Sequence, residues 1–120
     1  MAAPKRAIKP KRKPKYNNVR TKTPDGITHA SKKQAARWVH LLELQAQGII
    51  RNLRREVRYP LHVNGVKIGT YIADHQWDWA EDGRFHLEDV KSRSTVTPLY
   101  RRSKKHVKAE YGLDIIEFYG

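Results

Sequence analysis

Residues 66–91 read VKIGTYIADHQWDWAEDGRFHLEDVK, and this stretch decides how the rest of the chain can be arranged. β-Branched and aromatic side chains are frequent in both halves, which is typical of strands. Residues 80–83 separate the halves with small, acidic and glycine residues that favour a turn. The stretch therefore predicts two antiparallel strands that pair across this turn.

Charged residues end one side of each predicted strand. Because strand side chains alternate between faces, Asp74 shares a face with one apolar row, and Asp89 and Lys91 share a face with another. The rows are Val66, Ile68 and Ile72 in the first strand and Phe85 and Leu87 in the second. A turn centred between residues 81 and 82 sets Asp74 opposite Asp89, whereas a two-residue turn at 82–83 sets Asp74 opposite Lys91. Both registers gather the three charged side chains on one face.

A helix and a further strand precede this hairpin. Ser31 is a suitable N-cap for a helix whose apolar residues recur every three or four positions until Gly48 ends the pattern. Residues 49–63 then predict a strand, joined to the next one by Asn64-Gly65, a sequence typical of a tight hairpin turn. Pro60 indicates that this strand lies at a sheet edge or contains a bulge.

A second helix and a last strand follow the hairpin. Thr97-Pro98 occupies favoured N-cap and first-turn positions, and the helix is expected to run to about Tyr111 and stop at Gly112. Residues 115–118 predict a strand. The expected order is helix, three strands, helix, strand.

The first 24 residues differ from the rest in composition. They contain nine Lys or Arg, four Pro and no acid, so they cannot bury a core. We interpret residues 1–24 as a basic disordered arm before a single domain at residues 25–120. The arm either contacts phosphates or acts as a solubilising extension. Its candidate nucleic-acid-binding residues are Lys11, Arg12, Lys13 and Lys15.

Charge and composition restrict the partner and the chemistry. A net charge of +13 favours a polyanion such as nucleic acid. The chain has no Cys, which excludes thiol nucleophiles and cysteine-based zinc sites. It has no apolar run as long as a membrane span or a signal-peptide core, so we expect a cytoplasmic protein. No segment clearly predicts an amphipathic helix with bulky apolar residues opposite basic ones, so we expect no membrane binding.

Two carboxylates that face each other across a strand pair repel, which calls for a cation between them or a raised pKa in one. Carboxylate oxygens favour Mg²⁺ or Mn²⁺. Such an ion would act as a Lewis acid on phosphate, while Lys91 would orient the attacking water and neutralise developing charge. The pattern predicts a phosphodiesterase built around Asp74, Asp89 and Lys91. Alternatively, Asp74 and Lys91 form an exposed ion pair with Asp89 solvated nearby.

Four short motifs resemble a family of small phage and prophage proteins in the PD-(D/E)XK nuclease superfamily. They are Lys15-Tyr16-Asn17-Asn18, Ser31-Lys32-Lys33-Gln34-Ala35, Tyr71-Ile72-Ala73-Asp74 and Glu88-Asp89-Val90-Lys91. The resemblance covers roughly residues 15–119. It implies a restriction-endonuclease-like α/β (α+β) core, in which helices flank a mixed sheet in the order α-β-β-β-α-β.

The resemblance also implies roles for individual residues. Asp74, Asp89 and the backbone carbonyl of Val90 would be metal ligands, and Lys91 would be catalytic. Gln34 stands where the family usually has an acid in the first helix; it could ligate through its amide oxygen or hold a metal-bound water. Glu56 is an alternative ligand near the start of the first strand.

Two hypotheses for function follow. The first is a Mg²⁺- or Mn²⁺-dependent endonuclease that cuts double-stranded or branched DNA in a bacterial or phage-infected cell, as a homodimer by analogy. Arg101, Lys104 and Lys105, on the helix after the hairpin, would position phosphates. The second is a non-catalytic nucleic-acid-binding protein, either an inactive nuclease relic or an accessory of packaging or ribosomal type.

Deletion of residues 1–22 should weaken nucleic-acid binding, because it removes nine of the chain's cations. It should also flatten the dependence of affinity on salt, since fewer counterions are released from the phosphates. Titration of labelled DNA at several salt concentrations measures both effects. An unchanged salt slope would favour the solubilising interpretation of the arm.

Overall fold

The computed structural model describes residues 19–120. A two-stranded hairpin, β1 (Thr21–Lys22) and β2 (Thr28–His29), precedes helix α1 (Lys32–Ala46). Strands β3 (Ile50–Val63), β4 (Val66–Trp79) and β5 (Phe85–Val90) follow, and then the short 3-10 helix η1 (Arg93–Thr95), helix α2 (Pro98–Tyr111) and strand β6 (Ile115–Phe118). The predicted order of two helices and four strands is confirmed.

The main sheet has the order β3-β4-β5-β6. Neighbouring strands are antiparallel except β5 and β6, which are parallel, so the sheet is mixed. The parallel pair arises because α2 returns the chain to the starting end of the sheet before β6 begins. The α+β class is therefore confirmed. No helix in the described part of the chain has the length and apolar character needed to cross a membrane.

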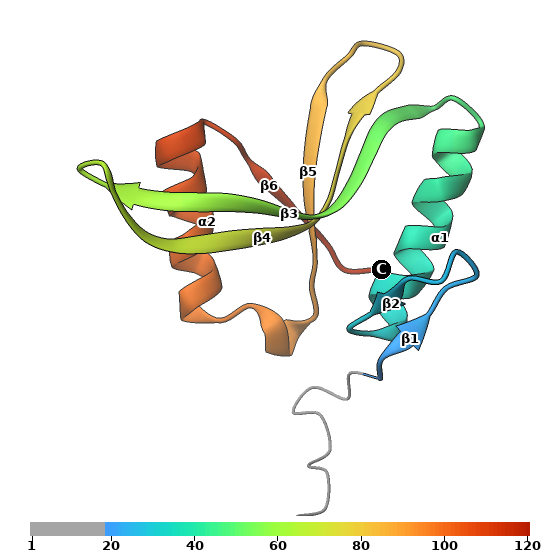
Figure 1. Ribbon diagram of the computed structural model, residues 1–120, viewed down its shortest axis with the longest axis horizontal. Helices are drawn as coiled ribbons and strands as arrows, with labels where there is room; N and C mark the ends of the chain where they lie inside the picture. Colours follow the sequence, from blue (N-terminus) through green and yellow to red (C-terminus); the bar gives the residue numbers. More distant parts are fainter. Residues whose placement is uncertain (1–18) are drawn as a thin grey trace, which may run out of the picture.

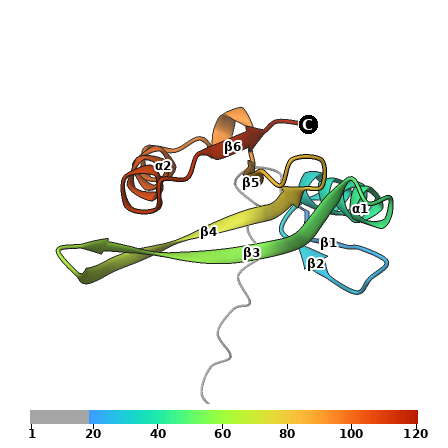
Figure 2. The ribbon, with the colours of Figure 1, turned by 90° about the horizontal axis from the view of Figure 1, so that it is seen from above.

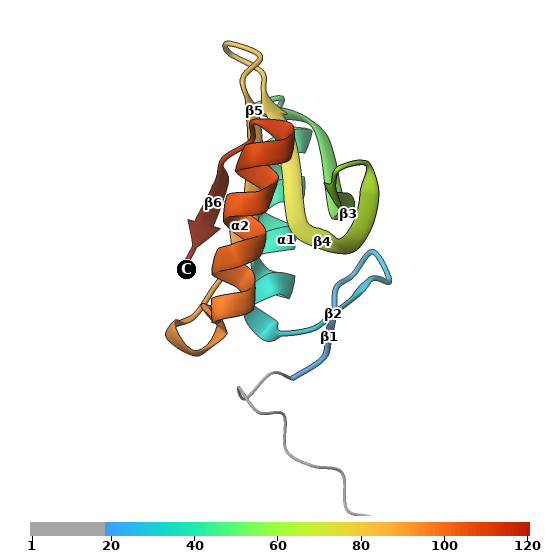
Figure 3. The same cartoon turned by 90° about the vertical axis from the view of Figure 1, so that its left-hand side faces the viewer.

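The helices cover opposite faces of β5. Consecutive strand residues point to opposite faces, and Leu87 packs in a core cluster with Tyr100 and Val107 of α2. Its neighbour Glu88 instead bonds to Arg37 of α1. Figure 1 shows α1 against the base of the β3–β4 hairpin, while the far part of the hairpin extends across α2. Figures 2 and 3 show α2 and β6 lying on the same side of that hairpin.

Both helices begin and end at the residues that the sequence indicated. The Ser31 side chain accepts a hydrogen bond from the backbone of Gln34, and Thr97 does the same for Tyr100. These caps satisfy amides that have no partner within the helix. Gly112 ends α2 with a φ of 69°, a left-handed conformation that suits glycine. The Ser31 cap matters for the site, because it fixes the first turn, from which Gln34 projects.

The β3–β4 hairpin confirms the predicted turn and the edge position of the first strand. Asn64 and Gly65 have φ values of 50° and 77°, as a tight hairpin turn requires. Strand β3 lies at the edge of the sheet, and its register with β4 shifts between Leu61 and His62. Pro60 is tolerated there because an edge strand does not need every amide.

The apolar row that shares a face with Asp74 along β4 is exposed to solvent. The exposed fractions of Val66, Ile68 and Ile72 are 65%, 59% and 45%. The buried side chains are those of the other parity, and they are Tyr71, Ala73, His75 and Trp77. The reason is that α2 covers only one face of the projecting hairpin, and no described element covers the other face.

The boundary of the basic arm also needs correction. Residues 21–24, assigned to the arm from composition, contribute β1 and the turn after it. Thr23 is buried and its hydroxyl lies 3.2 Å from His29 Nε2. Asp25 accepts a hydrogen bond of 2.7 Å from the Trp38 indole. This contact ties the hairpin to α1, so Thr21 already belongs to the folded domain, and a deletion that tests the arm alone must end before β1.

A buried ion pair attaches α1 to the sheet. The Arg37 guanidinium donates to both carboxylate oxygens of Glu88, at 2.9 and 2.7 Å, and His75 Nδ1 lies 3.3 Å from the same carboxylate. Burial alone would raise the pKa of Glu88, but hydrogen bonds from His75, His86 and Arg37 hold it well below its ordinary value. Glu88 is therefore ionised in the interior and depends on these partners.

Glu88→Gln should lower the free energy of unfolding by about 3 kcal/mol at neutral pH, because it leaves the Arg37 charge without its partner. The folded pKa of Glu88 is lowered, so its stabilisation exists above about pH 4.5 and is lost as the pH falls below that value. The variant should accordingly lose stability less steeply in acid. Urea unfolding monitored by tryptophan fluorescence, from about pH 3 to 7, measures both effects. Glu81→Gln, in an exposed turn, is the control; equal stability of the two variants would contradict this account.

Candidate active site

The register of β4 with β5 brings two carboxylates together. His75 pairs with Glu88, and Gln76 pairs with Leu87, so the next position along the hairpin sets Asp74 opposite Asp89. This is the first of the two registers that the sequence allowed. The turn that sets it spans residues 80–83 and is closed by hydrogen bonds from the amides of Trp79 and Gly83. A shift of one residue would move one of the two carboxylates to the other face.

Asp74 is held by groups from two other elements. Its Oδ2 accepts a hydrogen bond of 2.8 Å from the Val90 amide at the end of β5. Its Oδ1 lies 3.4 Å from Nε2 of Gln34, which projects from the first turn of α1. The site therefore depends on α1 and β5 as well as on the strand that carries Asp74.

Asp89 is the more buried carboxylate, with 6% of its surface exposed. Its Oδ2 accepts a hydrogen bond of 2.9 Å from the Tyr71 hydroxyl, and Lys91 Nζ lies 3.1 Å from the same oxygen. The side chains of Lys91 and Asp89 are 11% and 8% exposed. The alternative of an exposed pair between Asp74 and Lys91 is wrong, because Lys91 pairs with Asp89 in a largely buried position.

Lys91 is also placed by its other neighbours. Its ammonium lies 3.8 Å from the centre of the Tyr100 ring, where a cation is attracted to the aromatic face. Its backbone amide donates to Phe118 in β6, and its carbonyl accepts from the Lys33 ammonium of α1. Three elements thus fix the segment that carries Lys91.

One pocket of about 340 Å³ contains all four residues that the sequence singled out as catalytic. The carboxylates of Asp74 and Asp89 lie beside Lys91, and Gln34 lines the same pocket. The remaining lining comes from β4, the end of β5, the segment that follows it and the first part of α2. These residues are Tyr71, Ile72, Val90, Thr95, Thr97, Leu99, Tyr100 and Ser103.

The electrostatics of the pocket are unfavourable for two negative charges. Burial, followed by the adjacent Asp89, raises the pKa of Asp74 well above its ordinary value. Burial and Asp89 also raise the pKa of Tyr71, so its hydroxyl stays protonated and donates. Asp74 is therefore held as a neutral acid at neutral pH unless a cation enters the pocket.

The donor set suits a hard divalent cation. Asp74 and Asp89 offer carboxylate oxygens to the pocket, and Val90 lines it with them. Mg²⁺ is commonly bound by one or two carboxylates, with waters and substrate phosphates completing its coordination. No group of three or more acidic or histidine residues that could enclose a metal ion occurs within residues 19–120. Two carboxylates that leave room for waters and a substrate phosphate are enough for an open Mg²⁺ site.

The structure does not bring every predicted residue to this pocket. The Glu56 side chain is 64% exposed and pairs with Arg55 at 2.9 Å, so its carboxylate is not a substitute ligand beside Asp74. Arg101, Lys104 and Lys105 line a separate groove on another side of α2. The arm residues Lys11, Arg12, Lys13 and Lys15 lie outside the described part of the chain.

Two residues of the site were not predicted from the sequence. Tyr71 orients Asp89 through its hydroxyl, and Tyr100 supports Lys91 with its ring. Tyr71 stands three residues before Asp74 and has the opposite parity, so its approach to Asp89 could not be read from strand alternation. Tyr100 is in the first turn of α2, and its contact depends on how that helix packs.

Comparisons with known proteins give no relative. No protein-family model, no curated protein and no solved structure matches this chain. Any function must therefore be argued from the chemistry of the pocket.

Asp74→Asn should stabilise the metal-free protein at about pH 8 by roughly 1–3 kcal/mol. The folded pKa of Asp74 is raised, so the folded state binds the extra proton and wild type loses stability as the pH rises above about 4. Asparagine can keep the hydrogen bond from the Val90 amide through its one carbonyl oxygen, and because it carries no charge it removes this loss. Thermal unfolding in EDTA from about pH 5 to 9 measures the difference.

The same measurement with added Mg²⁺ or Mn²⁺ tests the donor set. A cation that binds the folded state raises the Tm of wild type, and Asp74→Asn should reduce that increase. A variant that is less stable than wild type at every pH would contradict the proposed repulsion between Asp74 and Asp89.

Proposed function

We propose that this chain is a metal-dependent nuclease that hydrolyses phosphodiester bonds in DNA. The observation that carries the proposal is that Asp74, Asp89, Lys91 and Gln34 line one pocket, although they come from α1, β4 and the end of β5. Two facing carboxylates weaken phosphate binding in a protein that only binds nucleic acid. They are useful when a divalent cation must be held beside the phosphate.

Four residues of the pocket have direct roles in this proposal. Asp74 and Asp89 would hold Mg²⁺ or Mn²⁺, together with the backbone carbonyl of Val90. The bound cation would supply Lewis-acid chemistry toward a phosphate oxygen. The Lys91 ammonium, held between Asp89 and the Tyr100 ring, would neutralise the negative charge that develops on the phosphate during hydrolysis.

The observed order of elements is consistent with a PD-(D/E)XK nuclease, the superfamily that the sequence motifs resemble. The proposal extends to branched DNA as substrate and to a homodimer, in which two sites would cut two strands. Both extensions rest on that resemblance alone.

The uncharged side chain of Gln34 favours a second candidate function. Gln34 contributes an uncharged amide where the resembling family usually has an acid, and its Nε2 approaches Asp74. This leaves two carboxylates in the pocket, so metal affinity is expected to be lower than with three. The second proposal is therefore a non-catalytic nucleic-acid-binding protein derived from a nuclease.

Cleavage of labelled linear, flapped and four-way-junction DNA tests the first proposal. Wild type should cut in Mg²⁺ or Mn²⁺ and not in EDTA. Asp74→Ala and Lys91→Ala should reduce the cleavage rate at least about 100-fold, because the first removes a metal ligand and the second removes the charge that faces the reacting phosphate. DNA binding in EDTA should stay within a few-fold of wild type.

Two further variants serve as controls. Asp89→Ala reports any contaminating nuclease, since activity that survives it does not come from this site. Glu81→Ala removes an exposed acid outside the pocket and should cut like wild type. Cleavage that persists in both Asp74→Ala and Lys91→Ala would mean that the site assignment is wrong.

Gln34→Glu separates the two proposed functions. If the pocket is weakened only by the missing acid, this variant should cut faster than wild type at low Mg²⁺, and Gln34→Ala should not. Salt-sensitive DNA binding without cleavage by wild type or Gln34→Glu would favour the non-catalytic protein.

A further inference from the structure

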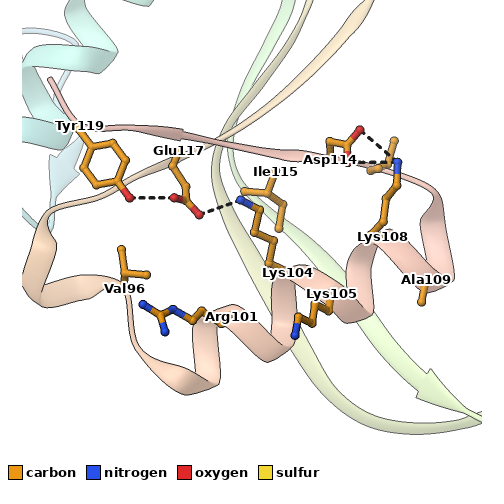
Figure 4. A pocket seen from close by; sticks show the side chains of 11 residues that line it. Val96, Arg101, Lys104, Lys105, Lys108, Ala109, Asp114, Ile115, Glu117 and Tyr119 are labelled. Carbon is orange, nitrogen blue, oxygen red and sulfur yellow. Dashed lines mark hydrogen bonds and ion pairs between the residues drawn. The ribbon is translucent and has the colours of Figure 1, made fainter.

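A second and larger hollow lies between α2 and β6. This α2–β6 groove has a volume of about 720 Å³ and is drawn in Figure 4. Val96, Ala109, Leu113 and Ile115 give it apolar surface, and charged residues of both elements line it. Its size is within the range of sites that take a small organic group such as a nucleotide.

The groove adjoins the candidate active site at the start of α2. Thr95 and Thr97 line the candidate active site, whereas Val96, between them, lines the groove. Farther along the helix, Tyr100 and Ser103 belong to the candidate active site, and Arg101 and the lysines belong to the groove. An extended ligand that leaves the candidate active site can therefore reach the groove by crossing the first turn of α2.

The groove carries more positive than negative charge. Its cations are Arg101, Lys104, Lys105 and Lys108, and its acids are Asp114 and Glu117. Lys104 pairs with Glu117 at 2.9 Å and Lys108 pairs with Asp114 at 3.1 Å. Within residues 19–120, the side chains of Arg101 and Lys105 form no ion pair or hydrogen bond. Two cations are thus available to an anion that enters the groove.

One aromatic ring lines the groove beside these charges. Tyr119 is 50% exposed, and its hydroxyl donates to Glu117 Oε1 at 2.8 Å. Glu117 also accepts from Lys104 and the Tyr100 hydroxyl, so the carboxylate that holds the Tyr119 hydroxyl is itself fixed by two other groups. Hydrogen bonds from Lys104 and Tyr119 lower the pKa of Glu117 to about 2, which keeps this anchor ionised. Figure 4 shows Tyr119 and Arg101 at the same end of the groove.

We propose that the α2–β6 groove binds an unpaired stretch of a nucleic-acid strand, with a base stacked on Tyr119 and phosphates bound by Arg101 and Lys105. Aromatic rings beside a positively charged groove are the combination that holds single strands, because every base has a face to stack. A duplex does not fit this combination, since its bases are already stacked inside.

An acidic peptide with aromatic side chains would match part of the same chemistry. The nucleic acid is favoured because the chain carries a net charge of +13 and because the groove adjoins the candidate active site, where the proposed nuclease function places a phosphodiester. The idea that the groove contacts the substrate rests on the nuclease function proposed above. The idea that the groove binds single strands does not depend on that function. It defines the substrate class as DNA with a single-stranded segment next to the bond that is cut.

Fluorescence anisotropy of the full chain in EDTA tests the proposal without cleavage. The probes are a labelled oligothymidylate of about 12 nucleotides and a strand of equal length and charge that lacks bases. Wild type should bind the strand with bases at least about 5-fold more tightly. Tyr119→Ala should reduce that preference to near unity, whereas Tyr119→Phe should keep it because the ring remains.

Charge variants test the phosphate contacts. Arg101→Ala with Lys105→Ala should lower the salt slope of binding by about 0.7 for each lost contact. Arg54→Ala with Arg58→Ala, an equal change of charge on exposed residues of β3, is the control and should leave the preference for bases unchanged. Circular dichroism of each variant verifies that the fold is kept.

Three results would overturn the proposal. The first is equal affinity of wild type for the two probes, and the second is an unchanged preference in Tyr119→Ala. The third is Tyr119-dependent binding of a glutamate–tyrosine copolymer without such binding of oligothymidylate, which would make the groove a peptide site. If the protein binds single strands through Tyr119 but does not cut DNA, this inference is supported and the proposed nuclease function is contradicted.

Discussion

The pairing of β4 with β5 is the constraint on which the rest of the site depends. Its register sets Asp74 opposite Asp89, and the same strand ending places Val90 and Lys91 beside them. The register is fixed on the other face by His75 and Glu88, which are buried against α1. A shift by one residue would bring the buried carboxylate of Glu88 to the pocket and separate the two aspartates.

Contacts with α1 stabilise the folded state, whereas ionisation of the two aspartates in the pocket would destabilise it. Arg37 and Glu88 form a bidentate, largely buried ion pair that attaches α1 to the sheet, and this attachment holds Gln34 close to Asp74. In the pocket, by contrast, burial and a neighbouring acid oppose ionisation of Asp74. Unfavourable charge that is maintained by a rigid surrounding is characteristic of sites that bind a cation or a substrate.

Helix α2 connects the two hollows of the molecule. The Tyr100 ring lies beneath Lys91 in the candidate active site, while its hydroxyl donates to Glu117 in the α2–β6 groove. Glu117 in turn binds Lys104 and Tyr119. The position of Lys91 is therefore coupled to side chains that line the groove, through contacts that are all made by one helix and the edge strand β6.

The sequence by itself determined the order of the main helices and strands, the helix caps and the Asn64-Gly65 turn, because these depend on local preferences of residues such as Ser31, Asn64, Thr97 and Gly112. Strand alternation also predicted that Asp74, Asp89 and Lys91 share a face, although it left two registers open, and the family resemblance added Gln34; all four line one pocket. Only the tertiary structure decided between the two registers and placed Val66 and Ile68 at the surface. It also showed that Glu56 lies outside the pocket and that Lys104 forms an ion pair with Glu117. These features depend on which faces α1 and α2 cover, and local sequence does not specify long-range packing.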